Sequence, residues 1–277
     1  MCRFKAAAIL YFAAIGAIGG VSAGDEIDEA VNDLRESGAE VRFLETFDSG
    51  RDVNVTFDLK SLTDQDMQKL GRISKLKSLA LNFCKIPHGS WRHLDRHSHL
   101  SDLVVFRSDF QVSQLPRLPK LESLETDEDS FREGIDSIRE KSPRLRRVII
   151  HGEVEDASPS IVELIANSNL TLTELLLVQV KLAKFDIARI GKLTQLRELS
   201  LDYCDFPSHE LQDLGGLRLL QSLTLTGSES LYSTEVTDEE VQSLSRLPYL
   251  KSLCLVSDRV NGRCIEKFPS LEDVTIL

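Results

Sequence analysis

The sequence predicts an α/β solenoid, in which short parallel strands stack into one sheet and helical or irregular segments return along its other side. The main observation is a pattern of leucines that returns about every 24 residues over most of the 277-residue chain. A second observation is that helix-start signals fall between the leucine-bearing strands. The third is an N-terminal helical pattern of the kind that closes one end of such a stack.

The repeat is clearest at Leu196–Phe206, which reads L-x-x-L-x-L-x-x-C-x-F. This is the strand-and-turn signature of a leucine-rich repeat. Because side chains alternate along a strand, Leu199 and Leu201 are predicted to point into the core, and Ser200 and Asp202 away from it. A second copy of the pattern, also with a cysteine at its ninth position, lies at Leu76–Ile86.

The phase of the pattern is kept along the chain. Repeats start at leucines 76, 100, 121, 145, 172, 196, 220, 250 and 271. A further strand near Asp52 precedes them, with Val55 and Phe57 at its two inward positions. The prediction is therefore a leucine-rich-repeat horseshoe over residues 51–277, with about ten strands and a parallel concave sheet. Thr126 replaces an inner leucine, so we expect the stacking to be least regular in the repeats at Leu100 and Leu121.

Helix signals fall between the strands. Thr63 to Asp66 and Thr237 to Glu240 have the form of capping boxes ahead of apolar positions. Ser158 followed by Pro159 predicts another helix start, with the serine as the cap. The polar insertion at residues 228–235 is predicted to be a protruding loop.

The first 23 residues are predicted to be a signal peptide. Arg3 and Lys5 precede an apolar run, and Ala23 ends a small-residue cleavage site. Cleavage would export the chain to the periplasm, the cell envelope or the extracellular space. The alternative is an uncleaved N-terminal membrane anchor, because the run is close to the shortest that can span a bilayer.

Residues 24–50 are predicted to form an N-terminal cap made of a helix and a strand. Ile27, Ala30, Val31 and Leu34 recur at helical spacing, and Gly38 would end the helix. A terminal repeat needs such a cover because it has no neighbour on one side. No comparable cap follows the last repeat, so self-association through the C-terminal repeat is an expected alternative.

The cysteines of the repeats are predicted to be core residues. Cys84 and Cys204 lie five repeats apart, which corresponds to about 24 Å along the stack. A disulfide needs Cα atoms within about 7 Å, so these two cannot pair. Both are interpreted as small buried hydrophobes, and no bridge is expected for Cys254 or Cys264.

Charge and motifs exclude several functions. The net charge of −11, or −13 without Arg3 and Lys5, disfavours nucleic-acid binding. The chain carries neither a nucleophile elbow nor a phosphate-binding glycine loop, so no enzymatic activity and no cofactor are predicted. His93 and His97 could share a helix face as zinc ligands, but no cysteine or glutamate completes the set. They are interpreted as surface histidines, and no metal site is predicted.

The outward positions of the strands form the candidate binding face. Ile149, Leu176 and Val178 are expected to form an apolar patch with His151, an arrangement typical of the centre of a protein interface. Glu125 and Asp127 would border this patch on one side, and Asp202 and Tyr203 on the other. Arg147 and Glu174 are expected to form a cross-strand ion pair. The predicted partner-binding residues are Phe106, Ile149, His151, Leu176, Val178, Ser200, Asp202 and Tyr203.

Residues 62–81 and 236–255 carry a family resemblance. Both resemble the (apolar)-T-D-x-x-(apolar)-x-x-L-x-x-L-x-x-L-x-x-L-x-L repeats of exported bacterial leucine-rich-repeat proteins of the planctomycete type. The cysteine-bearing repeats are also similar to those of F-box-type proteins. The resemblance implies a horseshoe with a concave binding face and no shared chemistry.

The function predicted from these observations is a non-enzymatic exported scaffold that binds a protein partner through its concave face. One alternative is binding of a glycan or a cell-envelope polymer, with Tyr203, Phe83 and Phe106 as stacking residues. The other is a structural, self-associating surface protein.

Overall fold

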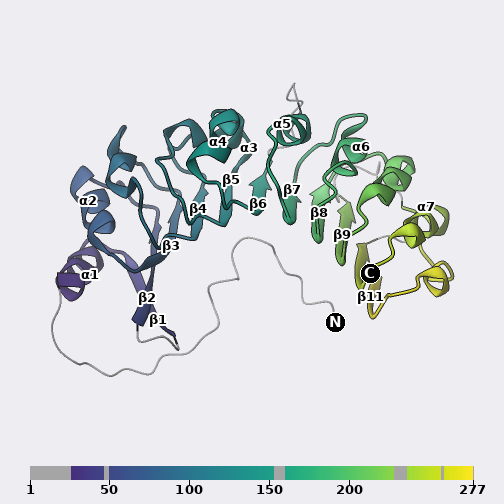
Figure 1. The fold of residues 1–277 in the computed structure, drawn as a ribbon, viewed down its shortest axis with the longest axis horizontal. Coiled ribbons are helices and arrows are strands. Elements are labelled where there is room, and N and C mark those ends of the chain that lie inside the picture. The colour runs from purple at the N-terminus through teal and green to yellow at the C-terminus, as the bar shows by residue number, and fades with distance from the viewer. Residues whose placement is uncertain (1–25, 47–49, 153–159, 228–235, 257–258, 277) are drawn as a thin grey trace. The chain divides into compact units, whose positions relative to one another are not determined.

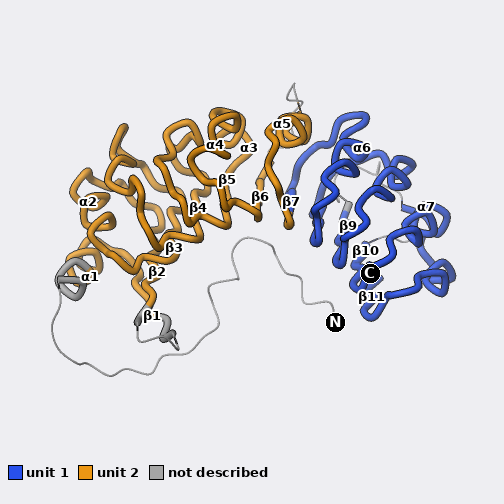
Figure 2. The backbone as a smooth tube through the Cα atoms, in the orientation of Figure 1, with its two compact units in different colours: residues 1–24, 153–156, 175–277 blue, residues 25–152, 157–174 orange. Residues whose placement is uncertain are grey.

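The computed structural model describes residues 26–46, 50–152, 160–227, 236–256 and 259–276. The described chain forms two compact units (Figure 2). We call residues 25–152 and 157–174 the N-terminal unit (orange in Figure 2), and residues 175–277 the C-terminal unit (blue). The predicted signal peptide and the predicted loop at 228–235 lie outside the described residues. Within the described ranges, no helix is both long and apolar enough to cross a membrane.

The N-terminal unit is built on strands that pair in chain order (Figure 1). These strands are β1 (Glu40–Thr46), β2 (Gly50–Asp58), β3 (Leu76–Asn82), β4 (Asp102–Phe106), β5 (Ser123–Asp127) and β6 (Arg147–His151). The pairs from β2 to β6 are parallel, and Ala80, Val104, Glu125 and Ile149 are aligned across four of these strands. The predicted parallel stack is confirmed, and it keeps its register through the repeats at Leu100 and Leu121.

Helical segments return along one side of this sheet. They are α1 (Glu26–Glu36), α2 (Asp64–Arg72), η1 (Ser90–Leu94), η2 (Val112–Gln114), α3 (Glu128–Arg132), α4 (Ile135–Lys141) and α5 (Ile161–Asn167). The capping box of α2 is confirmed, because the Asp66 N–H donates to Thr63 Oγ1 at 3.1 Å and the Thr63 N–H donates to Asp66 Oδ2 at 2.8 Å. The box fixes the start of the helix one residue after Thr63.

The prediction of Ser158 as the cap of α5 was wrong. The cap is Ser160, whose hydroxyl accepts the Glu163 N–H at 3.0 Å. Ser160 has an extended backbone and directly precedes the first apolar helical residue, which is the geometry that a serine cap requires. Ser158 and Pro159 themselves lie outside the described residues.

The helix and strand expected before the first repeat are present as α1 and β1. Strand β1 pairs with β2 in the antiparallel direction, unlike the strands of the repeats. Val31 and Leu34 on α1 are buried, and Asp33 lies 3.4 Å from Lys69 on α2. These elements therefore contact the first repeat, while the capping role assigned to residues 24–50 stays a prediction.

The core of the N-terminal unit contains the two inward positions of each strand, together with apolar residues of the returning segments such as Met67 and Phe131. Val55, Phe57, Leu79 and Leu81 are buried, as their place in the pattern predicted. The exception is Thr126, which is fully buried at a position where the other repeats carry an apolar residue. Its hydroxyl has no hydrogen-bond partner among the described residues. A buried hydroxyl without a partner destabilises the fold.

Replacing Thr126 with valine should therefore stabilise the protein. The change keeps the shape of the side chain and removes the unsatisfied hydroxyl, so we expect the free energy of unfolding to rise by about 1 kcal/mol. Urea unfolding followed by circular dichroism measures it. The control is Thr224→Val at a half-exposed outward position, where a change within about 0.5 kcal/mol is expected. A loss of stability in Thr126→Val would show that the hydroxyl is satisfied in solution.

The C-terminal unit repeats the same arrangement. Its strands are β7 (Glu174–Val178, of which the first residue belongs to the N-terminal unit), β8 (Glu198–Cys204), β9 (Ser222–Gly227), β10 (Ser252–Val256) and β11 (Asp273–Ile276). Ser200, Thr224, Cys254 and Thr275 are aligned across β8 to β11, all in parallel pairs.

The returning segments of the C-terminal unit are short. They are α6 (Asp186–Ile190), η3 (Ser208–Gly216), α7 (Asp238–Ser243), η4 (Leu244–Arg246) and η5 (Ile265–Lys267). The capping box of α7 is confirmed, since the Thr237 N–H donates to Glu240 Oε2 at 2.8 Å. The same local signal thus starts a helix in both units.

Two glycines allow neighbouring repeats to approach closely. A Cβ atom on Gly71 would lie 2.2 Å from the carbonyl oxygen of His93, and one on Gly191 would lie 2.2 Å from that of Asp213. In each case the obstacle is the backbone of the returning segment in the next repeat. Glycine is required here because the space beside its Cα is already filled.

Cys84 and Cys204 are core residues, as predicted. The Cys84 thiol donates to the carbonyl of Phe57 at 3.5 Å, and the Cys204 thiol donates to the carbonyl of Leu177 at 3.3 Å. Each thiol thus reaches the strand of the preceding repeat. Ser108 has the same place in its own repeat, and its hydroxyl donates to the carbonyl of Leu81 at 3.0 Å.

The buried thiols should react slowly. Burial raises the pKa of Cys84, and burial together with the hydrogen bond to Asp238 raises the pKa of Cys264 to about 11. Because the thiolate is the reactive form, we expect iodoacetamide to modify half-exposed Cys254 first in the native protein. Peptide mapping by mass spectrometry checks the order, and unfolding in urea should make Cys84 and Cys264 equally reactive. Rapid native modification of Cys264 would contradict the expectation.

Candidate protein-binding surface

The turns that follow β2, β3 and β4 each place a side chain in solvent. The residue after the last outward strand position has a left-handed backbone at Leu59, Phe83 and Arg107, with φ of 53°, 53° and 46°. This conformation costs about 1–3 kcal/mol for a residue other than glycine. The cost is offset by a hydrogen bond to the next repeat, for example from the Phe83 N–H to the Phe106 carbonyl at 2.8 Å.

The same turn recurs in the C-terminal unit. Gln179 and Tyr203 have φ of 56° and 51°, and the Gln179 N–H donates to the Asp202 carbonyl at 2.8 Å. The turn therefore recurs in several repeats of both units. Its consequence for function is that large side chains become exposed: Leu59 is 80% exposed and Phe83 is 44% exposed.

Four side chains at this edge of the N-terminal unit form a contiguous cluster, which we call the aromatic surface: Phe83, Phe106, Arg107 and His151. The rings of Phe83 and Phe106 meet edge to face with centroids 5.5 Å apart, and those of Phe106 and His151 lie 4.8 Å apart. The Arg107 guanidinium carbon lies 5.5 Å from the Phe106 centroid and 6.0 Å from the Phe83 centroid. These are cation–π distances, so the guanidinium rests on both rings.

Carboxylates adjoin the aromatic surface. Glu125 is only 8% exposed, and its Oε1 lies 2.9 Å from Nε2 of His151. Asp127 accepts the backbone N–H of Arg107 at 2.6 Å. Two acidic groups are therefore fixed beside the rings, and one of them is largely withdrawn from water.

The predicted site residues of the N-terminal unit are more covered than their outward direction suggested. Ile149 is 5% exposed, His151 is 9% exposed and Phe106 is half-buried. Their neighbours in the aligned rows cover them. Much of the exposed apolar area on this edge comes from Phe83 and Leu59, one residue beyond the rows that the strand pattern identifies.

The residues that the sequence interpretation left out of the site are Leu59 and Arg107, and Phe83 entered only as a glycan-stacking alternative. A signal for them exists. Phe83 is the last variable position before the buried cysteine in L-x-x-L-x-L-x-x-C, and Leu59 and Arg107 are at the same place in their own repeats. That position is exposed at Leu59, Phe83, Arg107 and Gln179, whereas Tyr203 in the same turn is half-buried.

In the C-terminal unit the predicted residues form a polar network. The Thr226 hydroxyl donates to Asp202 Oδ1 at 3.1 Å and accepts the Tyr203 N–H at 2.7 Å. Burial raises the pKa of Asp202, against hydrogen bonds from Thr226 and Ser200 that lower it. Leu176 and Ser200 are buried, while Val178, Asp202 and Tyr203 are half-buried.

The predicted ion pair is confirmed, with Arg147 and Glu174 2.8 Å apart within the N-terminal unit. The predicted apolar patch combines Ile149 and His151 of the N-terminal unit with Leu176 and Val178 of the C-terminal unit. That combination, and the partner-binding role of all eight predicted residues, stay predictions.

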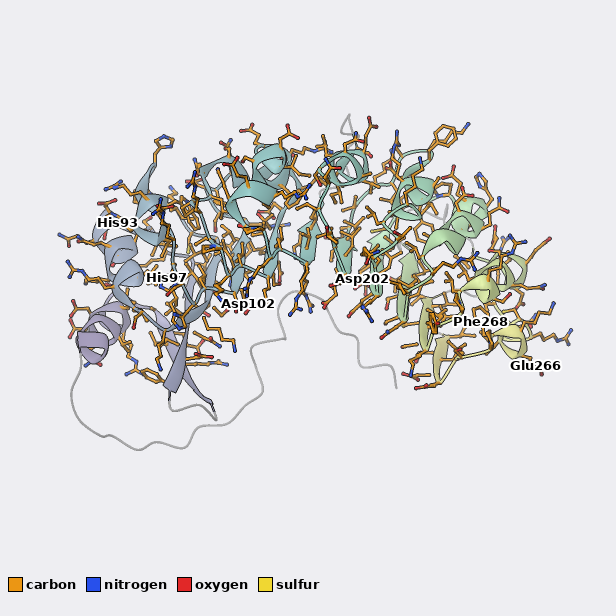
Figure 3. The ribbon with its side chains drawn as sticks, viewed as in Figure 1. His93, His97, Asp102, Asp202, Glu266 and Phe268 are labelled. Carbon is orange, nitrogen blue, oxygen red and sulfur yellow. The ribbon has the colours of Figure 1, made fainter. Side chains whose placement is uncertain are left out.

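His93 and His97, labelled in Figure 3, make separate contacts. His93 Nε2 lies 3.1 Å from Asp64 Oδ2, whereas His97 Nε2 lies 2.8 Å from the Ile73 carbonyl. His97 is buried, so its interpretation as a surface residue was wrong. In the part of the chain that the structure describes, no group of three or more histidine, cysteine, aspartate or glutamate side chains could hold a metal ion.

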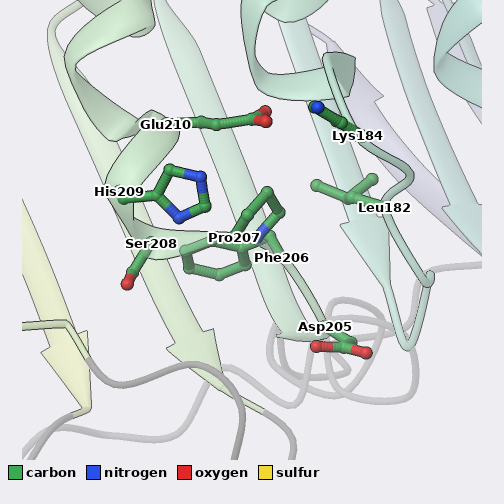
Figure 4. Close-up of a pocket in the computed structure, with 8 residues that line it drawn as sticks. All are labelled: Leu182, Lys184, Asp205, Phe206, Pro207, Ser208, His209 and Glu210. Atoms are coloured by element: carbon green, nitrogen blue, oxygen red, sulfur yellow. The ribbon is translucent and has the colours of Figure 1, made fainter.

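A hollow of about 600 Å³ lies on the returning segments of the C-terminal unit (Figure 4). Leu182, Phe206 and Pro207 supply its apolar lining, with Lys184 and Glu210 together at one end. Glu210 accepts the Phe185 N–H at 3.1 Å, and Ser208 donates to Glu240 at 3.0 Å. These polar groups stabilise the fold, which makes the hollow a weaker candidate than the aromatic surface.

No protein-family model matches the sequence, and no curated protein matches it. Among solved structures, the crystal structure of an internalin from Listeria monocytogenes is similar, with a TM-score of 0.43 and 16% sequence identity, covering 76% of this chain and 71% of that chain. A likeness at this level carries no inference about the fold or about a ligand. The repeated strands, their parallel register and the recurring turn show that each unit is an α/β stack of leucine-rich repeats.

Proposed function

We propose that this protein is a non-enzymatic, exported scaffold that binds a protein partner through the outward face of its strands. The observation that supports the proposal is the aromatic surface, on which Phe83 is exposed and Arg107 lies across two rings. Exposed aromatic side chains are among those that contribute most to the binding energy of protein interfaces. The rings are already ordered by contact with one another, so little side-chain freedom is lost on binding.

Export through cleavage of residues 1–23 belongs to the proposal, as does the partner-binding role of the outward residues in the C-terminal unit. Asp202 and Tyr203 would add polar contacts beside the turn, where half-exposed groups are held by Thr226. Binding of a glycan and pairing of two copies of the chain are the competing outcomes.

The test compares single substitutions in capture from the envelope fraction of the source cells. Phe83→Ala and Phe106→Ala remove ring area from the aromatic surface. Tyr249→Ala removes a ring of comparable exposure, 57%, from the C-terminal unit and serves as the matched control. We expect one protein to be recovered by the wild type and by Tyr249→Ala, and its yield to fall at least tenfold with each phenylalanine variant, as loss of a hot-spot residue predicts.

Equal recovery by all variants would exclude the aromatic surface as the binding site. Binding to a glycan array without recovery of any protein would overturn the proposal in favour of the glycan alternative. Recovery of only further copies of the same chain would favour self-association.

A further inference from the structure

The chemistry of the aromatic surface identifies the kind of partner that fits it. We propose that it receives a cationic side chain, so that the partner presents a basic segment with an arginine or lysine over the rings of Phe83 and Phe106. This inference rests on the binding function proposed above and adds the charge of the partner. It is argued from the rings, from the surrounding carboxylates and from the position of Arg107.

The rings of the aromatic surface can bind a cation directly. Aromatic faces attract a guanidinium or an ammonium group, most strongly when the group is partly removed from water. Phe83, Phe106 and His151 present three rings in successive contact over four repeats, with centroids 5.5 Å and 4.8 Å apart. An exposed ring that is already fixed by its neighbours needs no rearrangement to accept a cation.

The carboxylates around the aromatic surface add negative charge that favours a cationic partner. The outward positions of β2 to β5 carry Asp58, Asp102, Glu125 and Asp127, and the turn after β4 carries the guanidinium of Arg107. The arginines at outward positions of β1 and β6, Arg42 and Arg147, are paired with Glu40 and Glu174. The face therefore has an excess of negative charge, in line with the net charge of −11 of the whole chain. Such a field attracts a basic partner and repels an acidic one.

Arg107 marks the place of the incoming cation. Its side chain is exposed, yet its guanidinium lies 5.5 Å and 6.0 Å from the two phenylalanine centroids. The protein's own arginine thus occupies the aromatic surface in the unbound state, as a partner's arginine would in the complex. A partner's cation has to share or displace this contact, so Arg107 is a competitor rather than a contributor to binding.

Because Arg107 competes with an incoming cation, its removal should raise the affinity of the protein for a basic peptide. Fluorescein-labelled oligo-arginine and oligo-glutamate peptides of equal length serve as probes, with binding followed by fluorescence anisotropy on the full chain. We expect oligo-arginine to bind and oligo-glutamate not to bind. Phe106→Ala should weaken oligo-arginine binding about tenfold, whereas Arg107→Ala should strengthen it several-fold. If Arg107→Ala instead weakens it, or if oligo-glutamate binds more tightly, the proposal is overturned.

Two double variants distinguish the effect of the carboxylates beside the rings from the effect of the net charge on peptide binding. The double variant Glu125→Gln, Asp127→Asn removes two charges beside the rings. The control Asp136→Asn, Glu140→Gln removes the same charge from exposed positions of α4 in the same unit. We expect only the first double variant to lose oligo-arginine binding, with an unchanged circular dichroism spectrum. Equal loss in both would reduce the effect to the net charge and overturn the proposed site.

The outcomes distinguish the two proposals. If the phenylalanine variants lose a captured protein but Arg107→Ala weakens its binding, the binding function stands and the basic partner is excluded. If oligo-arginine binds as expected but no protein is captured, the receptor for cations stands without the protein-binding function.

Discussion

Replacing Gly191 with alanine should destabilise the protein by about 3 kcal/mol, the upper part of the range for overpacking. The added Cβ would lie 2.2 Å from the carbonyl oxygen and 3.1 Å from the carbonyl carbon of Asp213. Both atoms belong to the backbone of the next returning segment, so no side-chain rotation relieves the clash. The segment must move away, which separates two repeats that otherwise pack together. Guanidinium unfolding monitored by circular dichroism gives the free energy.

The chain offers a matched control for this change. Gly215 lies in the η3 segment, and a Cβ added there would meet no atom within 4 Å. Gly215→Ala should therefore change the free energy of unfolding by less than about 0.5 kcal/mol. Gly71→Ala repeats the clash in the N-terminal unit, where the obstacle is the carbonyl of His93 at 2.2 Å. Equal stability of Gly191→Ala and Gly215→Ala would show that the repeats can separate without cost.

Replacing His97 with alanine should lower the free energy of unfolding by about 3 kcal/mol, because hydrogen bonds are lost and a cavity is left. The ring is 8% exposed, and its Nε2 lies 2.8 Å from the Ile73 carbonyl. Its Nδ1 lies 3.3 Å from the Leu100 nitrogen, which is a donor. The partners fix the neutral tautomer with the proton on Nε2, and alanine would leave them unsatisfied. His99→Ala is the control, because His99 is exposed and close by in the same segment.

The same geometry predicts how stability depends on pH. Burial lowers the pKa of His97, with the nearby His99 acting in the same direction and the hydrogen bond to Ile73 acting against it. The folded state therefore binds the proton less readily than the unfolded state, whose histidine pKa is about 6.5. The contribution of His97 is complete above that pH and is lost as the pH falls below it.

The difference between the wild type and His97→Gln isolates this contribution from the carboxylates that titrate at lower pH. We expect the stability lost between neutral and mildly acidic pH to be smaller in the variant. A steeper pH dependence in His97→Gln would contradict the assigned tautomer.

The sequence could predict those parts of the fold in which regularly spaced apolar residues have to be buried. Leu79 and Leu81 must be buried in every register that buries their neighbours, so their spacing predicts the strands and their alignment. The direction of β1 could not be predicted in this way, because an alternating pattern is the same in parallel and antiparallel pairs. The cap of α5 was misplaced because two serines precede the helix and only backbone geometry selects Ser160.

The candidate site was harder to predict than the core. The alternation of side chains along a strand predicts which residues point outward. It does not predict how exposed they are, because exposure depends on the side chains of the neighbouring strands. Ile149 points outward and is nevertheless 5% exposed. The pairing of Glu125 with His151 joins side chains 26 residues apart, and no local pattern indicates it. The exposed position of Phe83 depends on a left-handed turn that its residue type disfavours.

The contacts of Cys84, Ser108 and Cys204 have a practical consequence. Each side chain donates to the carbonyl of the residue 27 positions earlier, and sulfur and oxygen perform the same task. Ser108 therefore shows that a serine hydroxyl can replace the cysteine thiol at this position of the repeat. Serine at positions 84 and 204 would keep the inter-repeat hydrogen bond, while valine or alanine would lose it. Replacing Cys84 and Cys204 on this rule would leave half-exposed Cys254 and buried Cys264 as the cysteines of the described residues, so that a spectroscopic label would react first on the outward row of β10 among them.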